Sequence, residues 1–191
     1  NGGGSVRTST VLGSLIAGGP VINSGNNEIF TDATANDDHP ELGFIERFFD
    51  ETQALDLGRV VVIGTQSTAS ASELVINGLE PFLDVVLVGS TTFGKPVGQI
   101  ARDRELCDDR LRVVAFRTVN AAGGGDYYDG LASVYPQTCA AEDDFLDPMG
   151  SPGEQSTATA LSFLRGGSCN PINGKPEGVK QQAARFFPSG L

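Results

Sequence analysis

Residues 59–79 read RVVVIGTQSTASASELVINGL, and this stretch decides the fold class. The continuous apolar run from Val60 to Ile63 predicts a strand that is buried on both faces, as strands of parallel sheets are. A polar turn follows, and from Leu74 apolar residues recur at helical spacing until Pro81 ends the helix. A buried strand joined by a short turn to a helix is typical of an α/β domain.

The segments on either side repeat strand and helix signals. Continuous or alternating apolar residues predict two further strands, at Asp84–Gly89 and Arg110–Val119. Apolar residues three and four positions apart predict helices over residues 8–17, 41–52 and 151–164. The stretches that lack either pattern are interpreted as a short strand with a surface excursion (21–40), a loop (90–99) and a loosely held tail (165–191).

The charge balance excludes two classes of partner. The chain has 191 residues, enough for one domain with a core of its own, and carries 13 Lys and Arg against 24 Asp and Glu. A net charge of -11 repels phosphate backbones and anionic headgroups, so we expect no nucleic-acid partner. The longest apolar runs are strand-sized, far short of the roughly 20 residues of a membrane helix, so no integral membrane segment is expected in this chain.

The three cysteines do not indicate a metal site. No Cys-x-x-Cys pair or zinc-ligand spacing occurs, and we expect neither a metal nor a cofactor. Cys107 and Cys139 flank a predicted strand and turn, so of the three single pairings we predict a Cys107–Cys139 disulfide, with Cys169 free or paired upstream. The acidic, Gly- and Asn-rich composition and such a bridge favour an extracytoplasmic location: periplasmic, lipoprotein-anchored or secreted.

Ser70 and Lys95 are the residues that could carry chemistry. Ser70 lies in the turn before a helix, where unpaired amides and the helix dipole stabilise developing negative charge. A serine nucleophile needs a base, and a neutral lysine, favoured by burial, can serve. Lys95 follows a buried strand between Gly94 and Pro96, and Gln99 could orient its amine.

Each of these residues also has a purely structural interpretation. Ser70 and Glu73 form the pattern of a helix capping box, and Lys95 alone would be a solvated loop residue. The spacing of these residues relative to one another favours the catalytic interpretation over the structural one. The Ser-Ala-Ser-Glu run from Ser70, the Thr92-Phe93-Gly94-Lys95 segment 25 residues after the serine, and Gln99 resemble the Ser-Lys catalytic segment of the tail-specific, or C-terminal processing, peptidases of family S41.

This resemblance implies roles for further residues. Ala71 would give one oxyanion-hole amide and Gly3, in the Gly-rich start of the chain, the other. Glu73 and Thr92 would support the site. Some relatives have an aspartate eleven residues after the serine, where this chain has Pro81, so a dyad is expected.

The resemblance also implies a fold, an extent and a substrate. The fold would be an α/β domain with the crotonase-like or ClpP-like ββα core of tail-specific protease catalytic domains. Residues 1–150 would form this core, without its first strand and the upstream peptide-binding PDZ domain of many members, and residues 151–191 a C-terminal helix and tail. The partner would be a peptide or protein substrate, and a sheet edge left open would favour a homo-oligomer.

The implied function is that of a serine endopeptidase acting through an acyl-enzyme on protein C-terminal regions. Two alternatives stay open. One is a non-catalytic ligand-binding relative of the retinoid-carrier type, which keeps the scaffold without proteolysis. The other is a Ser-Lys esterase or amidase for small molecules.

Overall fold

The chain was analysed as a computed structural model that describes residues 1–22, 28–104 and 107–173. The elements in chain order are α1 Val6–Ala17, α2 Gly19–Ile22, β1 Ile29–Ala35, η1 Pro40–Leu42, β2 Phe44–Arg47, β3 Arg59–Gly64, α3 Ala71–Leu79, β4 Asp84–Gly89, β5 Val97–Arg104, β6 Asp109–Val119, η2 Leu131–Ser133, β7 Thr138–Ala140 and α4 Gln155–Leu164.

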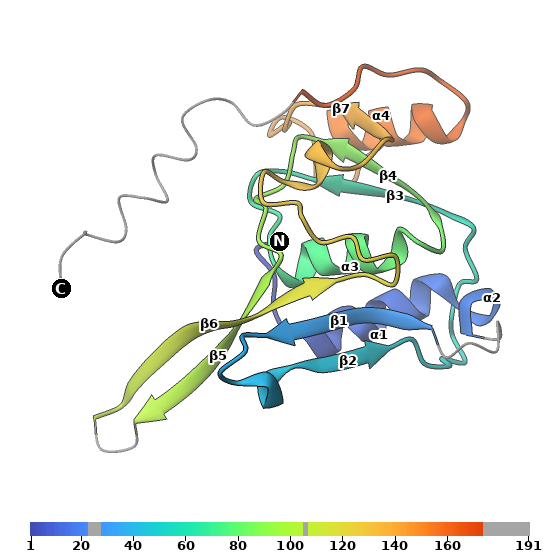
Figure 1. Cartoon of the computed structure of the whole chain (residues 1–191). Helices are drawn as coiled ribbons and strands as arrows, with labels where there is room; N and C mark the ends of the chain where they lie inside the picture. Colours follow the sequence, from blue (N-terminus) through green and yellow to red (C-terminus); the bar gives the residue numbers. More distant parts are fainter. Residues whose placement is uncertain (23–27, 105–106, 174–191) are drawn as a thin grey trace.

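The two sheets differ in strand direction. A three-stranded parallel sheet has the order β3-β4-β7, and a four-stranded antiparallel sheet has the order β2-β1-β6-β5. Helix α3 lies between the two sheets with α1 beside it, and α4 covers the other face of the parallel sheet (Figure 1). This mixed arrangement confirms the expected α/β class.

Strand β4, at the centre of the parallel sheet, is buried on both faces, which is why it is a continuous apolar run. The expectation that β3 is also buried on both faces is wrong, because this edge strand is only partly buried and its Ile63 is 45% exposed. On β4, Val85 and Leu87 belong to the main core with residues of α3, whereas Val86 and Val88 face the second cluster, with Ala160 of α4. Successive residues of a strand point to opposite faces, and because both faces of β4 are covered by a hydrophobic core, its residues do not alternate between apolar and polar. Helix α4, which follows position 150, therefore shares a hydrophobic core with the parallel sheet.

Phe30 of β1 packs between the antiparallel sheet and the two helices α1 and α3. Its ring is fully buried and stacks edge-to-face on Phe48, with centroids 5.3 Å apart. A Cβ added to Gly13 of α1 or to Gly78 of α3 would lie 2.6 or 2.5 Å from this ring. Both helices therefore carry glycine where the phenyl ring approaches, because no larger residue fits there.

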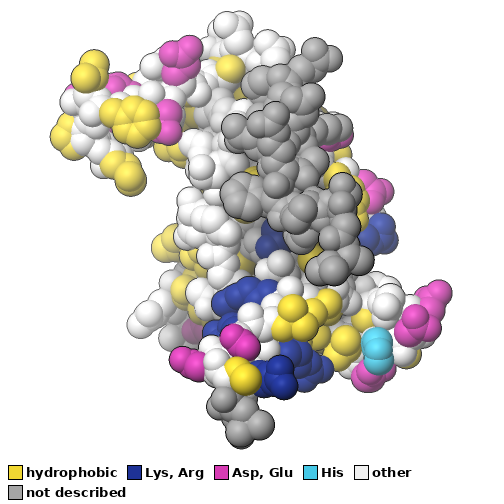
Figure 2. Space-filling model, turned by 90° about the vertical axis from the view of Figure 1, so that its left-hand side faces the viewer, with side chains coloured by type: hydrophobic (Ala, Val, Ile, Leu, Met, Phe, Trp, Pro, Cys, Tyr) yellow, Lys and Arg dark blue, Asp and Glu magenta, His cyan; other side chains and the backbone are white. Residues whose placement is uncertain are grey.

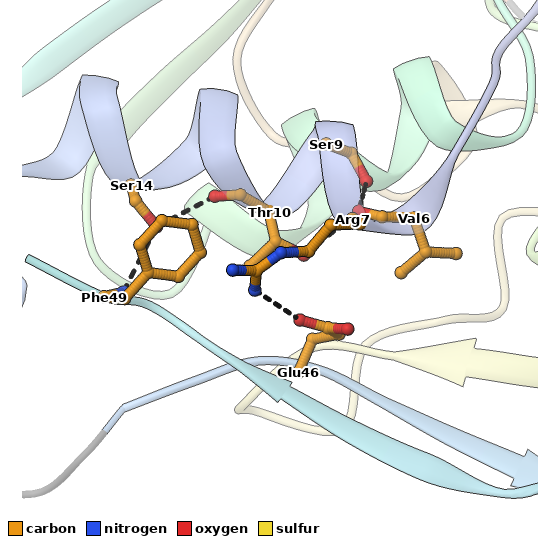
Figure 3. Close-up of polar contacts among 7 residues, drawn as sticks. All are labelled: Val6, Arg7, Ser9, Thr10, Ser14, Glu46 and Phe49. Carbon is orange, nitrogen blue, oxygen red and sulfur yellow. Dashed lines mark hydrogen bonds and ion pairs between the residues drawn. The ribbon is translucent and has the colours of Figure 1, made fainter. Parts of the chain in front are cut away.

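Helix α1 is held against β2 and the segment that follows it (Figure 3). The Arg7 guanidinium lies 3.5 Å from a Glu46 carboxylate oxygen and 4.4 Å from the centroid of the Phe49 ring. The Phe49 amide donates to the hydroxyl of Ser14, which in turn donates to the Thr10 carbonyl at 2.8 Å. These contacts fix the helix whose N-terminus continues directly from the Gly-rich segment.

Most local predictions are confirmed, and those for 41–52 and part of 90–99 are wrong. The strands at 59–64 and 84–89 have the predicted bounds, and the helices at 8–17 and 151–164 and the strand at 110–119 correspond to α1, α4 and β6. The helix predicted over 41–52 is instead a 3-10 turn and strand β2. Gly43 interrupts the helix, and pairing with β1 leaves Ile45 50% exposed, although the predicted helical face would have buried it.

Part of the loop expected over 90–99 is also wrong, because β5 begins at Val97. The expected tail at 165–191 is partly anchored: the Ala140 amide donates to the Asn170 carbonyl at 2.7 Å. Residues 174–191 lie outside the described part of the chain.

The predicted Cys107–Cys139 disulfide is wrong. Cys139 of β7 is bonded to Cys169, with Cα atoms 5.3 Å apart, and Cys107 is an exposed free thiol at the turn of the β5–β6 hairpin. The hairpin carries Cys107 away from the parallel sheet, whereas the chain after α4 returns alongside β7 (Figure 1). In the described ranges, no helix is both long enough and apolar enough to cross a membrane.

Candidate active site

Ser70 lies at the turn between β3 and α3, in a backbone conformation that is rare for a residue with a side chain. Its φ is 56° and its ψ is -122°, and it is the N-cap of α3. Such a conformation costs about 1–3 kcal/mol and persists only where surrounding contacts impose it. The turn has such contacts, because the Thr65 amide donates to the Thr68 hydroxyl and the Phe93 amide donates to the Thr68 carbonyl.

The fully buried carboxylate of Glu73 is the centre of these contacts. Its Oε2 accepts hydrogen bonds from the amides of Ser70 and Lys95, both at 2.9 Å. Its Oε1 accepts one from the Thr92 hydroxyl at 2.6 Å and one from the Gly94 amide at 2.8 Å. One carboxylate thus binds the serine turn to the lysine loop.

The neighbours of Glu73 are held in turn. The Thr92 hydroxyl accepts the Leu131 amide at 2.8 Å while it donates to Glu73, so its orientation is fixed. Burial, and then the negative charge of Glu73, raises the pKa of Tyr127 above its ordinary range. A buried charge with four donors is the arrangement in which an ion is stable inside a protein.

Ser70 and Lys95 line the same cavity, of about 430 Å³. The other residues expected to act in the site and found in its wall are Gly3, Ala71 and Gln99. Lys95 is half-buried and Gln99, on β5, is exposed. No hydrogen bond joins the Ser70 hydroxyl, the Lys95 amine and the Gln99 amide among the residues described, as is common in sites without substrate.

Gly3 lies directly against the serine turn. Its φ is +103°, and a Cβ added to it would be 2.8 Å from both the Ser70 Cβ and the Ala69 carbonyl oxygen. The Gly3 amide donates to the Asn1 side-chain oxygen at 3.0 Å. Ala71 is the first residue of α3, so its amide has no acceptor one turn earlier within the helix. The backbone at both positions is therefore close to the serine, with the Gly3 amide occupied by Asn1.

Sequence reasoning missed one charged residue of the cavity wall, Arg112 of β6. Alternation along residues 110–119 places it on one face of a strand, but only the pairing with β5 puts that face beside Gln99. No group of three or more His, Cys, Asp or Glu that could hold a metal ion occurs in residues 1–22, 28–104 and 107–173.

Comparisons with known proteins relate the chain to one family. The sequence profile described as Peptidase family S41 matches residues 1–125. Among solved structures, a Bacteroides fragilis protein assigned to the S41 proteases is 26% identical, with a TM-score of 0.75 over 87% of this chain and 43% of its own. The chain therefore spans less than half the length of that relative.

Two more distant structures share the fold. A photosystem II D1 C-terminal processing protease is 18% identical, with a TM-score of 0.52 over 73% of this chain and 32% of its own. A lipoprotein from Streptococcus agalactiae is 12% identical, with a TM-score of 0.58 over 87% of this chain and 52% of its own. A search of curated proteins found no match.

Proposed function

Because this chain belongs to peptidase family S41, we propose that it is the catalytic core of a serine peptidase in which Ser70 is the nucleophile and Lys95 is its general base. The observation that carries the proposal is the Glu73 carboxylate, which binds the backbone of both residues. Such a shared anchor fixes the spacing of nucleophile and base, which a two-residue mechanism requires.

The proposed reaction is acyl transfer in two stages. The Ser70 hydroxyl oxygen attacks the scissile carbonyl carbon while the neutral Lys95 amine takes the hydroxyl proton. The tetrahedral intermediate collapses when Lys95 returns that proton to the leaving amine, which leaves an ester on Ser70. A water molecule then attacks the ester, again with Lys95 as base, and the product acid and the free serine are released.

The oxyanion of each intermediate needs donors beside Ser70. We assign this role to the Ala71 amide at the N-terminus of α3 and to the Gly3 amide, whose close approach to Ser70 supports the assignment. The Gly3 amide would have to leave Asn1 to act. Gln99 would orient the Lys95 amine without exchanging a proton, and Thr92 would hold Glu73 in place.

We propose protein C-terminal regions as substrates and an extracytoplasmic location. The first rests on the Ser-Lys segment and on the fold shared with a C-terminal processing protease. The second is supported by the Cys139–Cys169 disulfide, because such bridges persist mainly in oxidising compartments.

A covalent serine probe tests the dyad. A fluorophosphonate should label the wild-type chain at Ser70, and labelling should fall roughly a thousandfold or more in Ser70→Ala, in Lys95→Ala and in the double variant alike, because the two residues act as a unit. Ser72→Ala is the matched control, since Ser72 lies two residues away and does not line the cavity. Gln99→Ala should reduce labelling less.

The outcomes separate the alternatives. Additive losses in the two single variants would contradict a dyad, and an unlabelled wild-type chain would favour a ligand carrier. Hydrolysis of ester panels without hydrolysis of peptide panels would favour an esterase.

A further inference from the structure

The strands of the β5–β6 hairpin carry five arginines in a chain whose net charge is -11, interspersed with the carboxylates of Asp103, Asp108 and Asp109. The hairpin extends beyond the rest of the antiparallel sheet (Figure 1), and Figure 2 shows Lys and Arg side chains gathered on the lower half of the face from which it projects. The exposed arginines of the hairpin strands are Arg102, Arg104, Arg110, Arg112 and Arg117.

Among these arginines only Arg112 lines the cavity that contains Ser70 and Lys95. In the antiparallel register Arg112 is opposite Ala101, two residue pairs from the Gln99 and Val114 pair. Opposite side chains share a face of a sheet, so Arg112 is on the Gln99 side of the hairpin, and the small side chain of Ala101 leaves space for its guanidinium. Arg102, paired with Leu111, is on the other face.

The carboxylate nearest to Arg112 on this face is already bound. Asp103 pairs with Arg110 through two hydrogen bonds, of 2.5 and 2.8 Å. The pKa of Asp103 is lowered mainly by this contact with Arg110 and further by the charge of Arg112. Within the described residues Arg112 itself has no hydrogen bond or ion pair, and the residues of the cavity wall include no Asp or Glu.

We propose that Arg112 is a specificity-determining residue that binds a carboxylate of the peptide substrate, either an Asp or Glu side chain near the scissile bond or the terminal carboxylate. A guanidinium presents two parallel N–H donors that match a carboxylate, and the cavity wall contains no Asp or Glu that would compete for it. The inference rests on the proposed peptidase function for the identity of the ligand as a peptide.

Equilibrium binding to the Ser70→Ala chain tests it without requiring catalysis. Fluorescent peptides that differ only by Glu or Gln at one internal position, scanned along the sequence, and peptides that end in a carboxylate or an amide are compared by anisotropy. At one position, or at the terminus, the acid form should bind about tenfold or more tightly than its amide. That position identifies the source of the carboxylate.

The ratio of the two dissociation constants should fall to about one when Arg112→Gln is added to Ser70→Ala. Arg102→Gln, an exposed arginine on the opposite face of the same hairpin, is the matched control and should keep the ratio. Effects on folding common to both peptides cancel in the ratio. Equal affinity of acid and amide peptides for Ser70→Ala, no binding of either, or a preference that survives Arg112→Gln would overturn the proposal.

A failure of the proposed peptidase function can be distinguished from a failure of the Arg112 proposal. Its failure appears as a wild-type chain that neither hydrolyses peptides nor is labelled at Ser70, even when Arg112-dependent binding of acid peptides is present. If both hold, the acid-to-amide ratio of kcat/KM in the wild-type chain should show the same preference at the same position.

Discussion

Replacing Glu73 by glutamine should uncouple the serine turn from the lysine loop while keeping the size of the side chain. Each carboxylate oxygen accepts two hydrogen bonds, Oε2 from Ser70 and Lys95 and Oε1 from Thr92 and Gly94. An amide retains one oxygen and presents an NH₂ group to the other two donors. Two hydrogen bonds to a charged group are then lost, at about 1.5–3 kcal/mol each, so unfolding should become easier by roughly 3–6 kcal/mol.

Urea unfolding followed by far-UV circular dichroism measures this loss, and the rate of Ser70 labelling measures its effect on the site. Glu154→Gln is the matched control, because Glu154 caps α4 through the Ser156 and Thr157 amides at 2.9 and 2.8 Å but does not line the cavity. It should lower the urea midpoint and leave the labelling rate unchanged. A Glu73→Gln chain with the wild-type midpoint and labelling rate would refute the argument that this carboxylate holds the site together.

Three further predictions follow from particular contacts. Gly3→Ala should reduce Ser70 labelling by about a hundred- to a thousandfold, because a Cβ at Gly3 would lie 2.8 Å from the Ser70 Cβ and displace the amide. Gly4→Ala is the control: no atom lies within 4 Å of the added Cβ, so this variant should be labelled at the wild-type rate. Equal labelling rates in the two variants would remove Gly3 from the oxyanion site. Thiol titration of the native, unreduced chain should find one reactive group, Cys107, and a second native thiol would contradict the Cys139–Cys169 bridge. Reduction of this bridge, which joins residues 30 positions apart, should lower the unfolding free energy by about 3–4 kcal/mol. The Thr157 hydroxyl and then the Ser156 and Thr157 amides lower the pKa of Glu154 below its ordinary 4.5, so the stability that this cap contributes is complete above that value and is lost as pH falls through the lowered pKa. The difference in unfolding free energy between wild type and Glu154→Gln should therefore be largest at neutral pH and vanish in acid. A difference that grows on acidification would show that the sign is wrong.

The local predictions succeeded where a short run of sequence contains its own signal. The apolar run at 84–89 is buried on both faces and the run at 59–64 is partly buried against both core clusters, so the composition of each predicts a strand. The segment at 41–52 has apolar residues at a spacing that a helix and an edge strand can both satisfy. Pairing with β1, which ends at Ala35 shortly before this segment and lies outside it, selected the strand.

The candidate site shows the same division. The sequence by itself predicted Ser70 as nucleophile and Lys95 as base, because the segment from β3 to the loop after β4 is continuous and resembles a family segment, and this prediction awaits the labelling test. It also indicated Glu73 and Thr92 as supporting residues, but not that one carboxylate receives all four donors.

Only the tertiary structure decided which distant residues meet. The return of the chain after α4 brought Cys169, and not Cys107, to Cys139. The register of the β5–β6 hairpin placed Arg112 in the cavity wall and left Arg102 outside it. The physical reason is that turns and buried strands are specified by neighbours along the chain, whereas a disulfide partner or a charge beside the serine depends on strand pairing and helix packing between segments far apart in sequence.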